Sequence, residues 1–408
     1  MRVLSIFFHP DPAVTAVGGA EKRFVETLKI LTKIGVDITV LEPKPSLLCR
    51  IGIPCRVIEL SSSVSSFVAG WLGIYVVWLL WTLKACARVL PIIRDRKYDV
   101  VLASNNTLPN LLVAFFIHLV SHRPLCVVVH HIDLLSPYSD SSFSVVHHVY
   151  RKIGYSKLVS FLKTTAFFVI LRLLKRCDAC ITVSVSTAKA LIRNGISEKR
   201  VYVNGNGVDI DYIDSFRFSG NKSSDGVFVG RITSEKGIFD LVKAWKSIVS
   251  VRSDARLLVI GSGPDIYELR RRVEKFDLEK NVIVKGRCSD REMYTLMKAS
   301  KVFIFPSYFE GWGLAVAEAL ACGLPVICYD IPALREVFGG CDSVFLVPVG
   351  EVKNFAVSVL RVLKMNEICQ LTKASRAYAK RFNWKKISMR DLQIIESVLQ
   401  SSSLRYQA

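Results

Sequence analysis

Two glutamates with seven residues between them stand in the stretch of this chain whose residue types point most directly to chemistry. Residues 302–330 (VFIFPSYFEGWGLAVAEALACGLPVICYD) predict a buried strand, a glycine-containing loop, an apolar helix and a second strand. Glu310 lies in the loop and Glu318 in the helix. Because helical side chains lean toward the helix N-terminus, we expect Glu318 to point back toward the loop. The two acids would then converge beside a helix N-terminus, which favours anionic ligands.

Both acids also admit a purely structural explanation. Glu310 could cap the turn that follows the strand, and Glu318 could pair with a neighbouring arginine inside the fold. An unpaired buried carboxylate is costly, so a structural partner for Glu318 is a reasonable alternative to a ligand.

A pair of cations follows the strand predicted at residues 226–229. Gly230, Arg231, Lys236 and Gly237 stand there as Gly-Arg, four residues, Lys-Gly. Arginine binds a diphosphate through its bidentate guanidinium group, whereas lysine acts as a point charge. Two fixed cations at a strand end would hold a diphosphate and stabilise the charge that grows on a leaving phosphate.

Two further candidate positions follow strands in the first half of the chain. Gly18 and Gly19 come after the first strand, where a Gly-Gly turn lets the backbone approach a ligand closely. His130 and His131 come after the strand predicted at 125–129, and open α/β sheets bind ligands at such strand ends. We favour His130 over His131 as the residue that lines the site. The alternative is a histidine whose ring is satisfied by backbone carbonyl groups.

These motifs resemble the signature of retaining glycosyltransferases with the two-domain GT-B fold, the group 1 / family 4 type that includes mannosyltransferase-like enzymes. The family pattern is Phe-Glu-Gly-x-Gly-Leu followed by Glu-Ala-x-Ala-x-Gly-x-Pro-Val, and residues 309–314 and 318–326 match it closely. The family's Gly-Arg-x-x-x-x-Lys-Gly matches residues 230–237, and its Gly-Gly loop matches residues 18–19. The resemblance covers nearly the whole chain, with the most specific motifs in the second half.

The resemblance implies an α/β protein with the GT-B fold, in which two doubly wound, Rossmann-like domains face a central cleft. Residues 219–225 (SGNKSSD) have the composition of a linker, although residues 204–209 (NGNGVD) resemble the family's hinge turn. We therefore predict an N-terminal acceptor-binding domain at 1–218 and a C-terminal nucleotide-sugar-binding domain at 219–382. Residues 383–408 are expected to form a helix that crosses back toward the first domain.

The resemblance also implies roles for individual residues. Arg231 and Lys236 would bind the diphosphate of a nucleotide-diphosphate sugar, Glu318 would bind the ribose hydroxyls, and Glu310 would contact the transferred sugar. The candidate donor-binding residues are Gly18, Gly19, Gly230, Arg231, Lys236, Arg287, Glu310, Gly311, Trp312, Gly313, Leu314 and Glu318. The candidate catalytic residues are Glu310, His130, Arg231 and Lys236. His130 and His131 would lie on the acceptor side.

Retention in this family is usually explained by attack from the face that the leaving phosphate occupies, with that phosphate acting as the base. No Asp-x-Asp metal motif stands in a matching loop of this chain. We therefore expect no divalent cation in the site and no cofactor besides the nucleotide-sugar substrate.

The composition limits the class of protein and its partners. With 408 residues the chain can form two domains, and 51% hydrophobic residues exclude an intrinsically disordered protein. The formal net charge of +20 implies an anionic partner such as a membrane face, a nucleic acid or a phosphorylated substrate. Eleven cysteines, without disulfide-type spacing, favour a reducing compartment.

Two segments of the first half suggest contact with a membrane. Residues 67–83 (FVAGWLGIYVVWLLWTL) carry no charge and are at the lower length limit for crossing a bilayer. A spanning helix would divide the first domain, so a helix lying in the membrane plane and a buried core helix remain the two explanations. Residues 141–177 contain no acid but seven basic residues among bulky apolar ones, which suits anionic lipid or a solvated amphipathic helix.

Both segments belong to the domain that would bind the acceptor. We therefore predict a lipid-linked or glycan acceptor, and an anionic membrane surface as a further partner. The expected location is cytoplasmic and peripheral (monotopic), at the inner face of the membrane. No nucleic-acid partner is expected, because no recognised nucleic-acid-binding motif occurs.

Two other classes of function remain open. A sugar-nucleotide epimerase with the GT-B fold would share the architecture and consume the donor without an acceptor. A basic membrane-binding or nucleic-acid-binding protein without catalysis would explain the charge, but it would leave Glu310 and Glu318 without a task.

Overall fold

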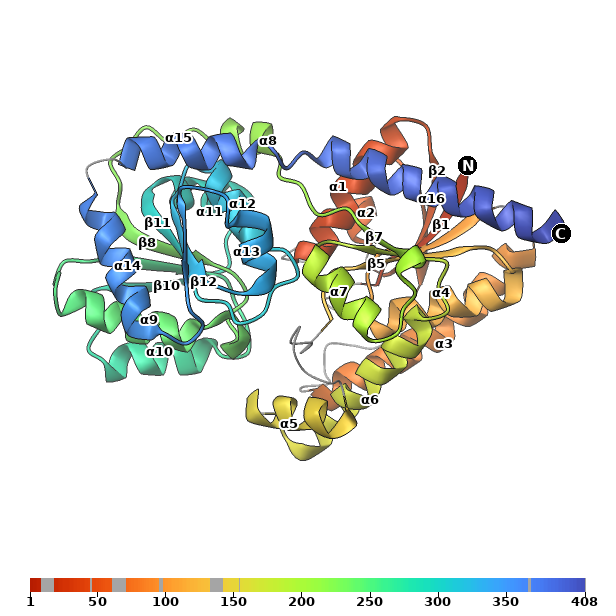
Figure 1. Ribbon diagram of the computed structural model, residues 1–408, viewed down its shortest axis with the longest axis horizontal. Helices are drawn as coiled ribbons and strands as arrows, with labels where there is room; N and C mark the ends of the chain where they lie inside the picture. The colour runs from red at the N-terminus through yellow and green to blue at the C-terminus, as the bar shows by residue number, and fades with distance from the viewer. Residues whose placement is uncertain are drawn as a thin grey trace. The chain divides into compact units, whose positions relative to one another are not determined.

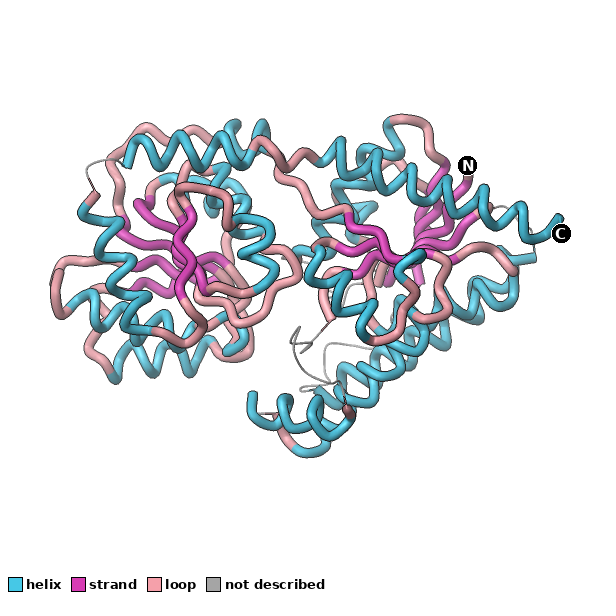
Figure 2. Tube along the Cα trace, in the orientation of Figure 1, coloured by secondary structure: helices cyan, strands magenta, loops and turns pink. Residues whose placement is uncertain are grey.

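The chain folds into two compact α/β units. One contains Met1–Gly205 together with Trp384–Ala408, and the other contains Asn206–Asn383. We call them the first unit and the second unit, and each is built around a parallel sheet (Figure 1, Figure 2). The computed structural model describes residues 1–8, 18–44, 46–60, 71–94, 98–132, 142–153, 155–365 and 368–407.

In the described part of the first unit, seven parallel strands pair in the order β3-β2-β1-β4-β5-β6-β7. The order reverses between β1 and β4, as in doubly wound folds. Side chains alternate between the faces of the sheet, so Leu4 and Ile6 join one hydrophobic cluster and Val3 joins the other. The strands are β1 (Arg2–Ile6), β2 (Asp37–Pro43), β3 (Arg56–Leu60), β4 (Val100–Ala103), β5 (Leu125–Val129), β6 (Ala179–Thr182) and β7 (Val201–Val203).

Helices cover both faces of this sheet. Helices α3, α4 and α6 pack against the face of Leu4, whereas α1 and the C-terminal helix α16 pack against the face of Val3 (Figure 1). The helical elements are α1 (Gly19–Lys33), α2 (Leu47–Arg50), α3 (Trp71–Arg94), α4 (Leu108–Ser121), α5 (Phe143–Ile153), α6 (Lys157–Leu174), α7 (Val185–Arg193), the 3-10 turn η1 (Glu198–Arg200) and α16 (Trp384–Gln407).

The described part of the second unit has six parallel strands in the order β10-β9-β8-β11-β12-β13, with the reversal between β8 and β11. Most of these strands are apolar runs because helices bury both of their faces. The strands are β8 (Ser224–Val229), β9 (Leu257–Ile260), β10 (Val282–Gly286), β11 (Ser300–Phe305), β12 (Val326–Tyr329) and β13 (Val344–Val347). The helical elements are α8 (Ile210–Ser215), η2 (Ser234–Lys236), α9 (Ile238–Val249), α10 (Ile266–Lys275), α11 (Asp290–Lys298), α12 (Leu314–Ala321), α13 (Pro332–Phe338), α14 (Val352–Lys364) and α15 (Ile368–Ala379).

The chain passes into the second unit earlier than the boundary that we predicted between residues 218 and 219. Helix α8 already belongs to the second unit: Lys298 Nζ donates to the carbonyl of Ile213 at 2.7 Å, and Arg376 pairs with Asp214 at 2.6 Å. Residues 219–225 form a polar connection inside this unit, and they run into β8. The crossing occurs at the turn that resembles the family's hinge, and α16 is part of the first unit.

Helix α3 takes up the described part of the apolar segment and continues it to Arg94. One of its faces packs into the core through residues four apart, which include Trp81, Ala85 and Val89. The opposite face exposes apolar side chains such as Leu79 and Leu83, which are 59% and 60% exposed. Among the described helices, its Tyr75–Arg94 portion is the one long and apolar enough to cross a bilayer by length and composition. Only 28% of this apolar stretch is buried in the protein.

Candidate active site

The motifs of the second half meet where β8 and β11 end. These two strands are neighbours at the point where the strand order reverses, and open α/β sheets bind ligands at such a point. Gly230 and Arg231 follow β8, and Lys236 ends the short turn η2. The loop from Pro306 to Gly313, which carries Glu310, follows β11.

The glycines of these motifs allow neighbouring loops to touch. Gly237 has φ +67°, and a Cβ atom there would lie 1.8 Å from the carbonyl oxygen of Pro306. Gly261, which follows β9, has φ +138°, and its Cβ would lie 1.9 Å from the oxygen of Gly230. Only glycine permits such contacts with this backbone conformation. The glycines thus allow the loops that follow β8, β9 and β11 to pack closely against one another.

Lys236 and Glu310, both predicted site residues, form an ion pair. Lys236 Nζ lies 2.5 Å from Glu310 Oε1, and the two side chains are 24% and 12% exposed. The Lys236 ammonium also lies 5.7 Å from the centre of the Phe305 ring. The structure therefore joins the predicted phosphate-binding cation directly to the predicted sugar-binding acid.

A buried carboxylate that we did not predict fastens the loop of Glu310. Asp240, in the first turn of α9, accepts hydrogen bonds from the hydroxyls of Tyr308 and Tyr329, the latter at 2.9 Å. The N–H of Tyr308 donates to the carbonyl of Glu235 at 3.0 Å. Burial and the Asp240 carboxylate raise the pKa of Tyr308, so its hydroxyl stays protonated. An acid within the apolar run IFDLVKAW was the available sequence signal.

Glu318 is buried in α12, and a tyrosine is one of its partners. Tyr294, which is fully buried, donates its hydroxyl to Glu318 Oε1 at 3.0 Å. Burial and the Glu318 carboxylate raise the pKa of Tyr294 well above its usual range. Glu318 stands four positions after Leu314, where α12 begins, and its lean toward the loop of Glu310 stays a prediction.

Trp312 turns its side chain into the core of the second unit. The indole is 5% exposed, and its ring centre lies 4.9 Å from that of Phe382 and 5.4 Å from that of Phe338. Only the main chain of Trp312 is therefore available to a ligand, together with that of Gly311, Gly313 and Leu314. The first N–H groups of a helix have no helical partner, so the start of α12 supplies donors.

The two predicted arginines of the site are exposed. The Arg231 guanidinium has no hydrogen bond or ion pair among the described residues, which leaves all of its donors available. Arg287 follows β10, the edge strand two positions from β8. It therefore lies farther along the same edge of the sheet than the cation pair.

In the first unit, His130 and His131 follow β5, and Asn106 holds the main chain of both. His130 N donates to Asn106 Oδ1 at 3.2 Å, and Asn106 Nδ2 donates to the His131 carbonyl at 2.9 Å. His130 is 8% exposed, and its Nε2 lies 3.4 Å from the carbonyl of Ser104, as the structural alternative proposed. Burial, with smaller contributions from Arg23 and His131, lowers the pKa of His130 to about 3, so its ring is neutral.

Gly18 and Gly19 stand at the start of α1, as the N-cap and the first helical residue. This position lies at the carboxyl end of the first sheet, as predicted from the order of strand and helix. The connection from β1, residues 9–17, lies outside the described residues.

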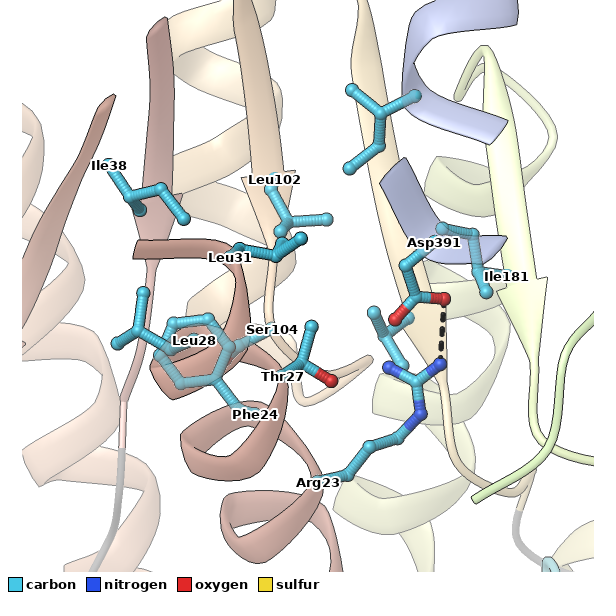
Figure 3. A pocket seen from close by; sticks show the side chains of 12 residues that line it. Arg23, Phe24, Thr27, Leu28, Leu31, Ile38, Leu102, Ser104, Ile181 and Asp391 are labelled. Atoms are coloured by element: carbon cyan, nitrogen blue, oxygen red, sulfur yellow. Dashed lines mark hydrogen bonds and ion pairs between the residues drawn. The ribbon is translucent and has the colours of Figure 1, made fainter. Parts of the chain in front are cut away.

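A narrow, mostly apolar cavity lies beside α1 and α16 (Figure 3), and its lining includes Ser104, whose carbonyl lies 3.4 Å from His130 Nε2. Arg23 pairs with Asp391 at 2.8 Å beside this cavity, and both side chains are buried. Arg23 Nε also donates to the Gly205 carbonyl at 3.2 Å, and Asn204 Nδ2 donates to Asp391 at 2.6 Å. This network ties the end of β7 to the C-terminal helix.

No described group of three or more His, Cys, Asp and Glu side chains is placed to hold a metal ion. Metal-independence stays a prediction about the reaction.

Two family models match consecutive parts of the chain. The model described as "Glycosyltransferase Family 4" matches residues 17–212, and the model described as "Glycosyl transferases group 1" matches residues 214–382. Among curated relatives, the 2-deoxystreptamine N-acetyl-D-glucosaminyltransferase of Streptomyces fradiae is 28% identical over 379 residues, which cover 86% of each chain.

A second relative is the N-acetylgalactosamine-N,N'-diacetylbacillosaminyl-diphospho-undecaprenol 4-alpha-N-acetylgalactosaminyltransferase of Campylobacter jejuni. It is 26% identical over 245 residues, which cover 59% of this chain and 64% of the relative. Among solved structures, Anabaena HepE in complex with UDP and glucose matches with a TM-score of 0.72 and 20% identity, over 97% of this chain and 100% of HepE. The predicted family and fold are thereby confirmed: this chain belongs to the group 1 / family 4 glycosyltransferases and has the GT-B fold.

Proposed function

We propose that this protein is a retaining, metal-independent hexosyltransferase that moves a sugar from a nucleotide-diphosphate donor to a membrane-borne acceptor. The pairing of Lys236 with Glu310 where β8 and β11 end carries the proposal, because it puts a phosphate-binding cation beside an acid that can bind sugar hydroxyls. HepE, a structural neighbour, was solved with UDP and glucose, which supports a nucleotide donor.

Different residues of the second unit would bind different parts of the donor. Arg231 and Lys236 would hold the diphosphate, with the N–H groups at the start of α12 as further donors. Glu318, already oriented by Tyr294, would accept hydrogen bonds from the ribose hydroxyls. Glu310 would bind hydroxyls of the transferred sugar, and the leaving phosphate would act as the base for attack on the same face.

The first unit would supply the acceptor side. The neutral ring of His130 can exchange hydrogen bonds with a sugar hydroxyl without adding a positive charge. His131 stands beside it at the end of β5.

Donor binding is tested by thermal unfolding with UDP, GDP, ADP and their sugars. A bound nucleotide raises the melting temperature by mass action, with or without a chelator. The double variant Arg231→Ala/Lys236→Ala should fold, lose this shift and lose transfer. Near-normal turnover in that variant would overturn the assignment of the donor site.

The products of the reaction test the mechanism. Consumption of donor without acceptor would indicate the epimerase. A product with inverted anomeric configuration would refute the retaining mechanism, and a requirement for a divalent cation would refute metal-independence.

Helices α5 and α6 supply the physical argument for a membrane-borne acceptor. The outer stripe of α6 is apolar: Leu158, Phe161 and Val169 are 53%, 51% and 36% exposed. Phe143 of α5, 41% exposed, lies 5.6 Å from Phe161 between ring centres. A helix that turns apolar side chains toward solvent on one face and toward the core on the other needs a further apolar partner. Exposed basic residues stand at the two ends of α6, namely Lys157, Arg172, Lys175 and Arg176.

The charge of the protein is concentrated in the same unit. The first unit has 29 Lys and Arg against 14 Asp and Glu, whereas the second unit has 26 against 21. Apolar side chains bordered by cations suit insertion into the interface of an anionic bilayer. The Campylobacter jejuni relative is named for a diphospho-undecaprenol acceptor, which supports a lipid-linked acceptor here. The cytoplasmic face of the membrane is the location that we propose for the transfer.

Membrane binding is tested by flotation with vesicles of anionic and of neutral lipids. The parent protein should float with anionic vesicles at low salt and less at high salt, because salt screens the basic residues. The variant Leu158→Ser/Phe161→Ser should float several-fold less. The matched control Val251→Ser/Val357→Ser removes apolar side chains that are 64% and 62% exposed on the second unit, and it should float like the parent. A parent protein that ignores both vesicles would refute this part of the proposal.

A further inference from the structure

We propose that the diphosphate of an incoming nucleotide takes Lys236 away from Glu310, and that this exchange frees Glu310 to bind the sugar. The inference rests on the proposed function and concerns the order in which the parts of the donor are recognised. Phosphate is bound first, and sugar recognition becomes available as its consequence.

The second unit holds the two groups in mutual contact. Lys236 Nζ lies 2.5 Å from Glu310 Oε1, and this is its one ion pair among the described residues. A carboxylate that accepts this hydrogen bond is less available to sugar hydroxyls, and the ammonium group is less available to phosphate. Neither residue can therefore perform its proposed role fully until the pair has opened.

Arg231, unlike Lys236, is not engaged in an ion pair among the described residues. Its guanidinium is exposed and has no hydrogen bond or ion pair among the described residues. An approaching diphosphate therefore meets Arg231 as an unengaged cation. Once Arg231 holds one phosphate, the other phosphate lies near Lys236. Its charged oxygens then compete with the Glu310 carboxylate for the Lys236 ammonium group.

The loop of Glu310 is fixed, so the exchange involves side chains alone. Tyr308 binds the Glu235 carbonyl through its N–H and the Asp240 carboxylate through its hydroxyl. Gly237 lies against Pro306 with no room for a Cβ atom. Lysine has a flexible stem and can redirect its charge, whereas Glu310 stays in place. The acid is thus held ready for the sugar and is blocked only by its cation.

The inference predicts opposite effects of one substitution on two ligands. Glu310→Gln removes the competing carboxylate charge, so binding of a nucleoside diphosphate should tighten by about two- to fivefold, the range of a partly exposed ion pair. The same variant should lose transfer and gain no affinity for the complete nucleotide sugar, because the sugar has lost its acid. If Glu310 had only a structural role, the substitution would weaken the binding of the nucleoside diphosphate and of the nucleotide sugar alike.

The experiment is isothermal titration of UDP, GDP and ADP, and of their sugars, into the full-length protein. Glu235→Gln serves as the matched control, since it removes the same charge next to Lys236 and leaves the ion pair intact. Equal melting temperatures of the variants show that folding is retained, and Glu310→Ala provides a second test of the same competition. The control should bind each nucleoside diphosphate as the parent does.

Two results overturn the inference and are distinguishable. If the parent binds a nucleoside diphosphate but Glu310→Gln and Glu310→Ala bind it no more tightly, the exchange is refuted and the proposed function stands. If the parent binds none of the nucleotides, the proposed function fails and the exchange fails with it.

Discussion

Tyr308 anchors the candidate acid through two separate bonds. Its main chain binds the Glu235 carbonyl, and its hydroxyl binds Asp240. Asp240 is buried, so its carboxylate depends on hydroxyl donors from Tyr308 and Tyr329 and on Lys243 at 3.3 Å. The position of Glu310, two residues along the loop, therefore rests on a hydroxyl that need not touch the ligand.

Substituting Tyr308→Phe removes that hydroxyl and keeps the ring. We expect unfolding to become easier by about 1 kcal/mol. Transfer should slow by about three- to tenfold, since small displacements of a positioned group lower the rate. The substitution should act mainly on kcat and leave nucleotide binding near the parent value. Chemical denaturation measures the change in stability, and steady-state kinetics measure kcat and KM. Tyr267→Phe, at a side chain that is 82% exposed, is the control. An unchanged kcat would show that the hydrogen bond from Tyr308 to Asp240 has no positioning role.

Residue chemistry was predictable where several residues stand in one motif. Lys236 and Glu310 could be predicted as neighbours in one site because each belongs to a spaced pattern with glycines, and the structure brings them into contact. Asp240 and Tyr308 lie 68 positions apart, and no spacing rule pairs them. The burial of Trp312 was equally inaccessible, because a glycine-flanked aromatic residue fits a ligand site and a core cluster alike.

At the level of elements, the site is made by loops that interlock at the ends of β8, β9 and β11. Gly237 is the tightest of these contacts, with a positive φ and the Pro306 carbonyl where a Cβ would stand. Gly350 also has a positive φ, of +82°, but nothing lies within 4 Å of its Cβ position. Substituting Gly350 therefore measures the cost of the backbone conformation alone, whereas substituting Gly237 adds the cost of a steric clash.

Substituting Gly350→Ala should therefore lower the free energy of unfolding by about 1 kcal/mol, the cost of a left-handed conformation. Gly237→Ala should lower it by about 2–4 kcal/mol, because the loop must also move away from Pro306. Urea denaturation of both variants measures the difference. Equal losses would mean that the contact between the loops relaxes freely and does not hold the site.

The elements themselves were largely predictable, because both sheets are parallel and their strands are short apolar runs. The boundary near residue 218 was misplaced because a polar surface connection and a linker share one composition. Helix α3 could not be decided between membrane and core, since an apolar sequence does not show that Trp81 is buried while Leu83 is exposed.

On the scale of the whole molecule, the two units divide the chemistry and the surface between them. The second unit holds the cations and acids of the proposed donor site and has a nearly balanced charge. The first unit holds most of the excess positive charge and the exposed apolar stripes of α3 and α6. The proposed donor specificity and the proposed attachment to a membrane would therefore change independently through substitutions in different units.

The return of α16 to the first unit has a consequence for biosynthesis. Leu392, Ile395 and Val398 cover one face of the first sheet, and Asp391 neutralises the buried Arg23. These residues are synthesised after the whole second unit, because they follow it in the sequence. The nascent first unit therefore cannot bury this apolar face or neutralise Arg23 through α16 until the second unit has been synthesised.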